Sequence, residues 1–148
     1  MSKFYNILEV PQRSEEWKKT RLKYITASEV PTLFGHYGSD KTNTPLKLAF
    51  QKLYQIEFPT NPNNEYIFEK GHLAEEEIRK WVHKNTDLQM NPLVVVSKIV
   101  PNLLASLDGF DSRQNAVIEA KYIGAKRRET LCEDGCLPES HLLQMQAL

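Results

Sequence analysis

Hydrophobic residues recur every three to four positions along roughly the first 85 residues, a spacing typical of amphipathic helices. The pattern predicts helices over residues 13–24, 26–35, 44–55 and 64–85. Ser14 is placed to cap the first helix and Ser28 the second, which tolerates Pro31 in its first turn and ends at Gly35. Gly71 lies inside the longest helix, where glycine costs about 1 kcal/mol relative to alanine. We therefore expect another group to approach closely at Gly71.

The periodicity changes in the second half of the chain. The runs "LVVVSKIV" (93–100), "LLASLDGF" (103–110) and "AVIEAKYI" (116–123) are apolar or β-branched and bounded by Pro, Asn or Gly, which predicts strands. The last segment, "PESHLLQMQAL" (138–148), has helical spacing again. This order of elements predicts a sheet flanked by helices, an α/β or α+β fold, and the length suits a single domain over residues 1–148.

Composition and charge narrow the function classes. With 41% hydrophobic residues the chain can build a core, and 19 Lys and Arg balance 19 Asp and Glu. A net charge of zero argues against a nonspecific nucleic-acid coat. It does not exclude a DNA enzyme, because acidic residues at a metal site would offset basic residues elsewhere. The longest apolar runs are too short to cross a bilayer, and the first residues lack the pattern of a secretory signal. We expect a cytoplasmic protein without membrane contact.

A zinc site is not indicated. Cys132 and Cys136 are a lone pair with only His141 as a candidate third ligand, so we expect ordinary reduced thiols in a loop. His72 and His83 lie on about the same face of the long predicted helix, but neither belongs to an H-E-x-x-H motif. The sequence therefore does not predict a zinc hydrolase.

Two acidic residues and a lysine stand out in the predicted strands. Glu119 and Lys121 are two apart and leave the same face of a strand, while Asp108 ends the previous strand, where Gly109 lets the chain turn. If the strands pair, Asp108 and Glu119 converge, and Mg²⁺ would offset their repulsion. Lys121 could then hold a metal-bound water for phosphodiester hydrolysis. The alternative is a cross-strand ion pair on a solvated sheet face.

This arrangement resembles the signature of PD-(D/E)XK nucleases and, more narrowly, lambda-type phage exonucleases and YqaJ-like viral recombinases. Four stretches carry the resemblance in the family's order: "EWKKTRLKYITASEV", "GHLAEEE", "SLDG" with "IEAK", and "HLLQMQ". Together they span nearly the whole chain. The residues that match the family's motifs are Trp17, Arg21, Ser28, Gly71, Glu75, Asp108, Glu119, Lys121 and Gln144.

The resemblance implies a restriction-endonuclease-like core, with a central mixed sheet flanked by helices and an N-terminal helical segment. It also implies the roles of the central residues. Asp108 and Glu119, with the backbone carbonyl of Ala120, would hold Mg²⁺ or Mn²⁺. Glu75 would be an outer ligand or the anchor of a second ion. Lys121 would activate the attacking water.

The resemblance also implies roles for the other matched residues in positioning water and binding DNA. Gln144 would orient the attacking water or its neighbours, and Arg21 and Ser28 would bind the terminal 5′ phosphate. A forked, permanently charged guanidinium suits phosphate, and a hydroxyl at a helix start lies near backbone N–H groups. These roles imply a 5′→3′ exonuclease acting on ends of linear double-stranded DNA in recombination, repair or viral DNA processing. A single-strand annealing protein is the expected partner.

Two departures and two rival functions stay open. The sequence ends inside the last predicted helix, whereas longer relatives continue into parts that build a ring-shaped trimer, so ring formation is uncertain here. "SLDG" also lacks the proline that often precedes the family's aspartate. The same core would suit an endonuclease or nickase. It would also suit a non-catalytic DNA-binding protein, although that protein would be expected to have lost one of the central residues.

Overall fold

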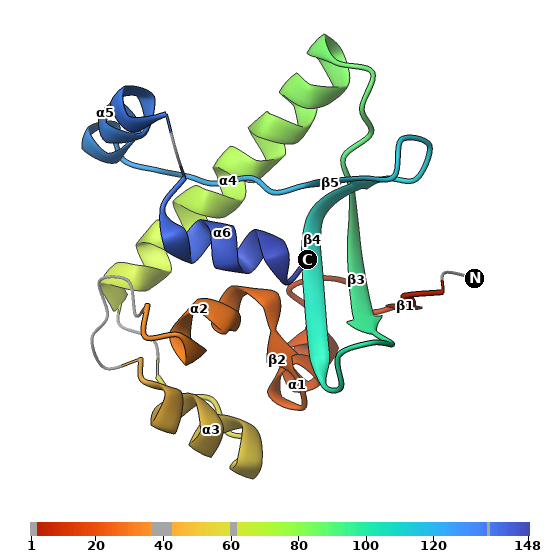
Figure 1. Cartoon of the computed structure of the whole chain (residues 1–148), viewed down its shortest axis with the longest axis vertical. Helices are drawn as coiled ribbons and strands as arrows, with labels where there is room; N and C mark the ends of the chain where they lie inside the picture. The colour runs from red at the N-terminus through yellow and green to blue at the C-terminus, as the bar shows by residue number, and fades with distance from the viewer. Residues whose placement is uncertain (1–2, 37–42, 60–61, 136) are drawn as a thin grey trace. The chain divides into compact units, whose positions relative to one another are not determined.

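The computed structural model describes residues 3–36, 43–59, 62–135 and 137–148 (Figure 1). Two compact units are each assembled from separate stretches of sequence. The first comprises Met1–Phe58, Leu93–Leu107 and Glu139–Leu148, and the second Pro59–Pro92 and Asp108–Pro138. The expectation of a single domain over 1–148 stays a prediction. In the described residues, no helix is both long and apolar enough to cross a membrane.

A mixed β-sheet has its strands in the order β1-β3-β4-β2, and the greater part of these strands belongs to the first unit. The strands are β1 (Tyr5–Leu8), β2 (Ile25–Thr26), β3 (Asn91–Ser97) and β4 (Leu103–Asp111). β1 runs antiparallel to β3, with Ile7 opposite Val95, and β2 runs parallel to β4. The predicted mixed sheet and α+β class are therefore confirmed. β1 and β2 were not predicted.

The helices of the first unit include α1 (Glu15–Leu22) and α3 (Pro45–Tyr54), near their predicted positions. Ser14 caps α1 as predicted, because its hydroxyl accepts a hydrogen bond from the N–H of Trp17 at 3.1 Å. Next come a 3-10 turn (Ala27–Glu29) and α2 (Val30–Leu33). The predicted Ser28 cap is wrong: Ser28 lies inside the turn, and Thr26 occupies the cap position.

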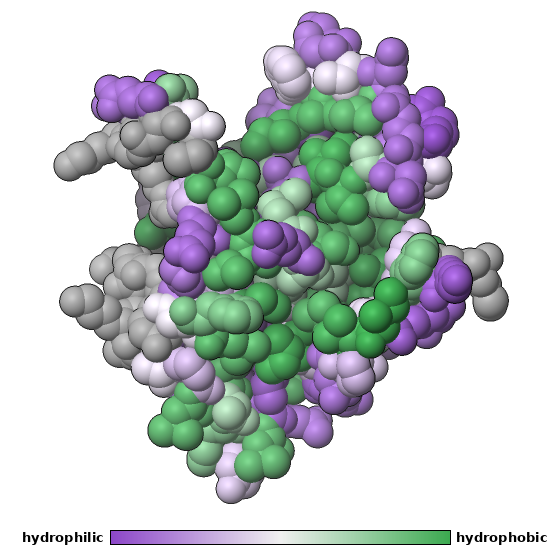
Figure 2. Space-filling model, viewed as in Figure 1, coloured by the Kyte–Doolittle hydropathy of each residue, from purple (hydrophilic) through white to green (hydrophobic). Residues whose placement is uncertain are grey.

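The core of the first unit lies where the sheet meets its helices. Helix α6 (Glu139–Gln146), predicted from the last segment, packs against α2 (Figure 1). Side chains of the turn, of α3 and of the two central strands are buried: Ala27, Leu48, Val94, Val95, Leu104, Ala105 and Leu107. Leu46 and Leu53 of α3 remain exposed. Hydrophobic residues gather at the lower end of the view in Figure 2, where Figure 1 places α3.

The second unit is built around the long helix α4 (Pro62–Asn85), which confirms the predicted helix. β5 (Ala116–Ile118) pairs antiparallel with the end of β4, with Ile118 opposite Gly109. β5 is shorter than predicted, so Glu119 and Lys121 follow the strand rather than lie within it.

The predictions for Gly109 and Gly71 are wrong. Gly109 does not begin a turn but lies within β4, where an added Cβ would stand 2.2 Å from Cγ and 2.9 Å from Cα of Met90. The chain turns instead at 112–115, where Asn115 has a φ of 50°. At Gly71, by contrast, an added Cβ would meet no described atom within 4 Å, so the expected close approach is absent from the described structure.

A helix replaces the loop predicted around the cysteines. α5 (Ala125–Asp134) includes Cys132, which is exposed and has a free thiol. Cys136 lies outside the described residues. His83 has a structural contact, since its Nε2 accepts a hydrogen bond from the N–H of Met90 at 2.9 Å.

Candidate active site

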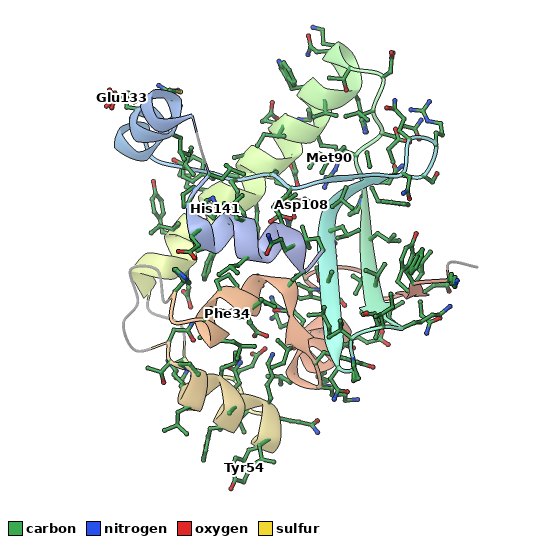
Figure 3. All side chains as sticks on the ribbon, in the orientation of Figure 1. Phe34, Tyr54, Met90, Asp108, Glu133 and His141 are labelled. Carbon is green, nitrogen blue, oxygen red and sulfur yellow. The ribbon has the colours of Figure 1, made fainter. Side chains whose placement is uncertain are left out.

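Asp108 projects from β4 in the second unit (Figure 3). Its Oδ2 accepts a hydrogen bond from the backbone N–H of Ala120 at 2.8 Å, which ties β4 to the segment after β5. Because Ala120 follows Glu119 directly, the structure brings together the groups that the sequence predicted as metal ligands. Convergence therefore occurs although β5 ends before Glu119.

Burial and neighbouring carboxylates disfavour the ionised form of Asp108. Burial raises its pKa to about 6 from the ordinary value of 3.8, and the carboxylate of Glu119 contributes to the rise. The Ala120 N–H opposes this rise, Glu75 adds to it and Lys121 opposes it, in decreasing order. In the metal-free protein, the surroundings of Asp108 therefore disfavour its ionised form. A bound cation would reverse that preference.

Lys121 and Glu119 form the second part of the site. The Nζ of Lys121 lies 2.6 Å from Oε1 of Glu119, and the side chain of Glu119 is 8% exposed, compared with 35% for Lys121. The segment after β5 holds both side chains together, as the E-x-K spacing predicted. The ammonium group is therefore held beside the acidic pair while remaining accessible to water.

Glu75 reaches its place from α4. Its Oε1 lies 2.9 Å from Nη2 of Arg79, one helical turn later. Arg79 also donates from Nε to the carbonyl of Met90 at 3.2 Å and from Nη2 to the carbonyl of Asp108 at 3.4 Å. Within the part of the chain that the structure describes, no three Asp, Glu, His or Cys side chains are grouped closely enough to hold one ion. The assignment of Asp108, Glu119 and the Ala120 carbonyl as ligands of an ion stays a prediction.

The predicted phosphate-binding residues belong to the first unit. The guanidinium of Arg21 lies 4.5 Å from the ring centre of Trp17, and burial lowers the pKa of Arg21 while Glu29 and Glu57 favour its charged form. Ser28 is exposed, and its hydroxyl lies 3.1 Å from that of Thr26.

A second cation supports this region and was missed from the sequence. Lys52 of α3 lies 2.8 Å from the carboxylate of Glu29 and donates to the carbonyl of Arg21 at 2.9 Å. Both side chains of the Lys52–Glu29 pair are mostly buried. Helix α3 thereby fixes the end of α1, where Arg21 lies.

Gln144 also belongs to the first unit, on α6. It is only 9% exposed, unlike a typical surface glutamine. Burial of an amide implies that its hydrogen bonds are made within the protein. The predicted role of Gln144 in orienting water stays a prediction.

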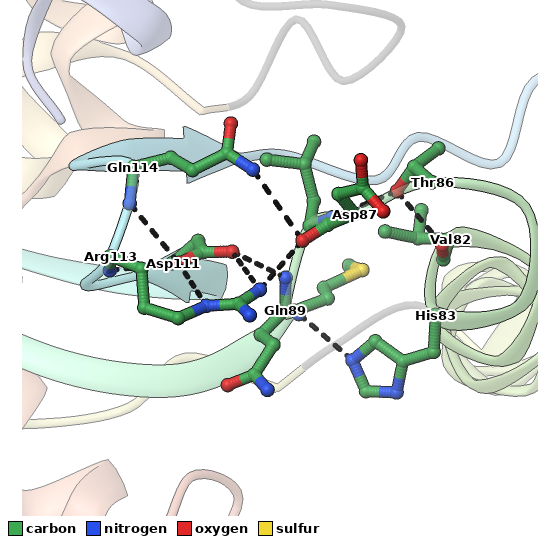
Figure 4. A network of polar contacts seen from close by, with 10 residues as sticks. Val82, His83, Thr86, Asp87, Gln89, Asp111, Arg113 and Gln114 are labelled. Carbon is green, nitrogen blue, oxygen red and sulfur yellow. Dashed lines mark hydrogen bonds and ion pairs between the residues drawn. The ribbon is translucent and has the colours of Figure 1, made fainter.

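A buried carboxylate fixes the turn between β4 and β5 (Figure 4). Asp111 is 0% exposed and accepts hydrogen bonds from the backbone N–H groups of Gln89 at 2.7 Å, Arg113 at 2.8 Å and Gln114 at 3.2 Å. The guanidinium of Arg113, 3.1 Å away, contributes most to holding the pKa of Asp111 well below its usual range. This network sets the geometry of the hairpin that carries Asp108.

The mixed sheet, with two carboxylates and a lysine gathered beside one hairpin, defines an α+β protein with a compact acidic site. A family model described as the YqaJ-like viral recombinase domain matches residues 16–148, so the chain belongs to the YqaJ-like viral recombinase family. This match confirms the family resemblance and places the chain among viral recombination proteins. No curated protein and no solved structure matches it.

Proposed function

We propose that the protein is a metal-dependent nuclease that degrades linear double-stranded DNA from its 5′ ends. The observation that carries this proposal is the hydrogen bond from Ala120 to Asp108, because it brings the two acidic residues and Lys121 to one place. Family membership supports an action on DNA during recombination. The single strands released would suit a strand-annealing partner.

The site fits a hard divalent cation. Carboxylate and carbonyl oxygens are the ligands that Mg²⁺ and Mn²⁺ prefer, and Mg²⁺ commonly binds through one or two carboxylates and several waters. Burial, followed by the carboxylate of Glu119, raises the pKa of Asp108, and a bound cation would favour its ionised form. Asp108, Glu119 and the carbonyl of Ala120 would hold the ion. When bound, the ion supplies a Lewis acid for the phosphate and lowers the pKa of a coordinated water.

The chain's own residues would act around that ion. Lys121, fixed by Glu119, would donate a hydrogen bond to the attacking water and favour its deprotonated form. The water would lose a proton to bulk solvent as its oxygen attacks phosphorus. The bond between phosphorus and the 3′ oxygen would break, and the leaving 3′ oxygen would take a proton from a second water. Gln144 would orient the water, and Arg21 with Ser28 would bind the 5′ phosphate, which sets the polarity of digestion.

The test compares linear duplex with covalently closed circular DNA, in Mg²⁺ and in chelator. We expect digestion of the linear form only, in Mg²⁺ only and faster with a 5′ phosphate. Lys121→Ala should lower the rate on the order of 10²- to 10⁴-fold while DNA retention persists. Lys80→Ala is the matched control, because Lys80 forms an exposed pair with Glu77. Normal cleavage by Lys121→Ala would show that the assigned mechanism is wrong.

The other outcomes identify the rival functions. Cleavage of the closed circle would support an endonuclease or nickase on the same core. No cleavage of either substrate, with DNA retention intact, would support a non-catalytic DNA-binding protein. Arg21→Ala also distinguishes an exonuclease from an endonuclease. In an exonuclease, this variant should lose the preference for DNA with phosphorylated 5′ ends.

A further inference from the structure

Arg79 connects the long helix to the strand that carries the acidic site. Its guanidinium donates to Oε1 of Glu75 at 2.9 Å, to the carbonyl of Met90 at 3.2 Å and to the carbonyl of Asp108 at 3.4 Å. These acceptors come from α4, from the residue before β3 and from β4, all within the second unit. A planar fork of donors is the group best suited to hold several acceptors in fixed directions.

The surroundings of this ion pair distinguish it from an ordinary helix-surface pair. The side chains of Arg79 and Glu75 are 25% and 13% exposed. On the same helix, Lys80 and Glu77 form a pair at 2.6 Å whose side chains are 71% and 72% exposed. Exposed pairs contribute little because water screens them, whereas a half-buried, multiply bonded guanidinium restricts its partners.

We propose that Arg79 is a positioning residue of the nuclease site: it holds the carboxylate of Glu75 and the backbone of Asp108 in one fixed relation, so that both serve the same divalent ion. This inference rests on the proposed function. Glu75 then acts from the outer shell of the ion. Outer-shell partners of this kind tune metal affinity by about 10- to 100-fold.

The direction in which metal affinity changes when Arg79 is replaced distinguishes a positioning role from a purely electrostatic one. If Arg79 acted only through its positive charge, its removal would relieve repulsion toward a cation, and metal would bind more tightly. If it acts by positioning, its removal frees Glu75 to turn toward solvent, and metal binds more weakly. A purely structural role would lower stability but leave the affinity of the folded fraction unchanged.

The experiment measures the Kd of the full chain for Mn²⁺ by calorimetry, alongside kcat and KM for linear duplex. Arg79→Gln should raise the Kd for Mn²⁺ and lower kcat by about 10-fold or more, with KM for DNA little changed. Lys80→Gln replaces a basic side chain by glutamine in the neighbouring exposed pair. It should change neither the Kd for Mn²⁺ nor kcat. Arg79→Lys, which keeps the charge but loses the fork, should recover only part of the loss and serves if Arg79→Gln does not fold.

A double variant tests whether Arg79 influences metal binding through Glu75. If Arg79 acts largely through Glu75, the change Arg79→Gln should cost much less in a Glu75→Gln background than in the wild type. Unchanged or tighter Mn²⁺ binding by Arg79→Gln, in a wild type that binds Mn²⁺ and cleaves DNA, would overturn this inference and leave the proposed function standing. A wild type that neither binds Mn²⁺ nor cleaves DNA would overturn both.

Discussion

Replacing Asp108 by asparagine should stabilise the metal-free protein at high pH while removing its metal site. The native fold raises the pKa of Asp108 from 3.8 to about 6, chiefly through burial. At 1.36 kcal/mol per pKa unit this corresponds to about 3 kcal/mol, and partial exposure of the side chain reduces the expected effect to about 1–2 kcal/mol. Asparagine keeps an oxygen that can accept from Ala120.

The sign of the stability difference between Asp108→Asn and the wild type follows from the direction in which the fold shifts the pKa of Asp108. Because native Asp108 binds its proton more tightly than the unfolded chain does, the resulting stabilisation is present below about pH 4 and lost as pH rises through about 6. The asparagine side chain of the variant does not titrate. We therefore expect Asp108→Asn to match the wild type near pH 4 and to exceed its free energy of unfolding by about 1–2 kcal/mol near pH 8.

Urea unfolding in the presence of chelator measures this difference. Titrating groups distant from Asp108 contribute equally to both proteins and cancel when the two curves are subtracted. A variant that is less stable than the wild type at pH 8, or a difference independent of pH, would refute the reasoning. Mn²⁺ titration of the two folded proteins, without urea or chelator, should show binding by the wild type only.

Two further comparisons test the packing of both units. Gly71→Ala should raise the free energy of unfolding by about 1 kcal/mol, whereas Gly109→Ala should lower it by about 1–3 kcal/mol because its Cβ would collide with Met90; thermal melting of the two variants checks both signs. Lys52→Met should cost about 3 kcal/mol by leaving the mostly buried carboxylate of Glu29 without its ion pair, and adding Glu29→Gln should restore part of the loss. Equal stability of the Lys52→Met single variant and the wild type would contradict that account.

Local signals explain the parts of the fold that were predictable. Ser14 stands directly before an amphipathic run, and its hydroxyl caps the helix there. β4 carries an apolar pattern that follows from its burial. α5 could not be predicted in this way, because "AKRRETLCED" has no apolar stripe. Nor could the two-residue β2, whose existence depends on a partner strand far along the sequence.

The candidate site likewise has residues that could be predicted from the sequence and residues that could not. Spacing along the chain was enough to group Glu119 with Lys121, since a two-residue step in extended backbone puts both on one side. Arg79 was not predictable, because within "EEEIRKW" it has the same appearance as a solvated helix charge. Its partners Met90 and the carbonyl of Asp108 follow 11 and 29 residues later, so only the fold reveals them. Long-range contacts of this kind leave no local pattern.

Anomalous diffraction from crystals soaked in Mn²⁺ tests the central claim most directly. The account predicts one strong peak between the carboxylates of Asp108 and Glu119, with the carbonyl oxygen of Ala120 also at ligand distance. A peak at another place, or no peak while both carboxylates point away from each other, would contradict it.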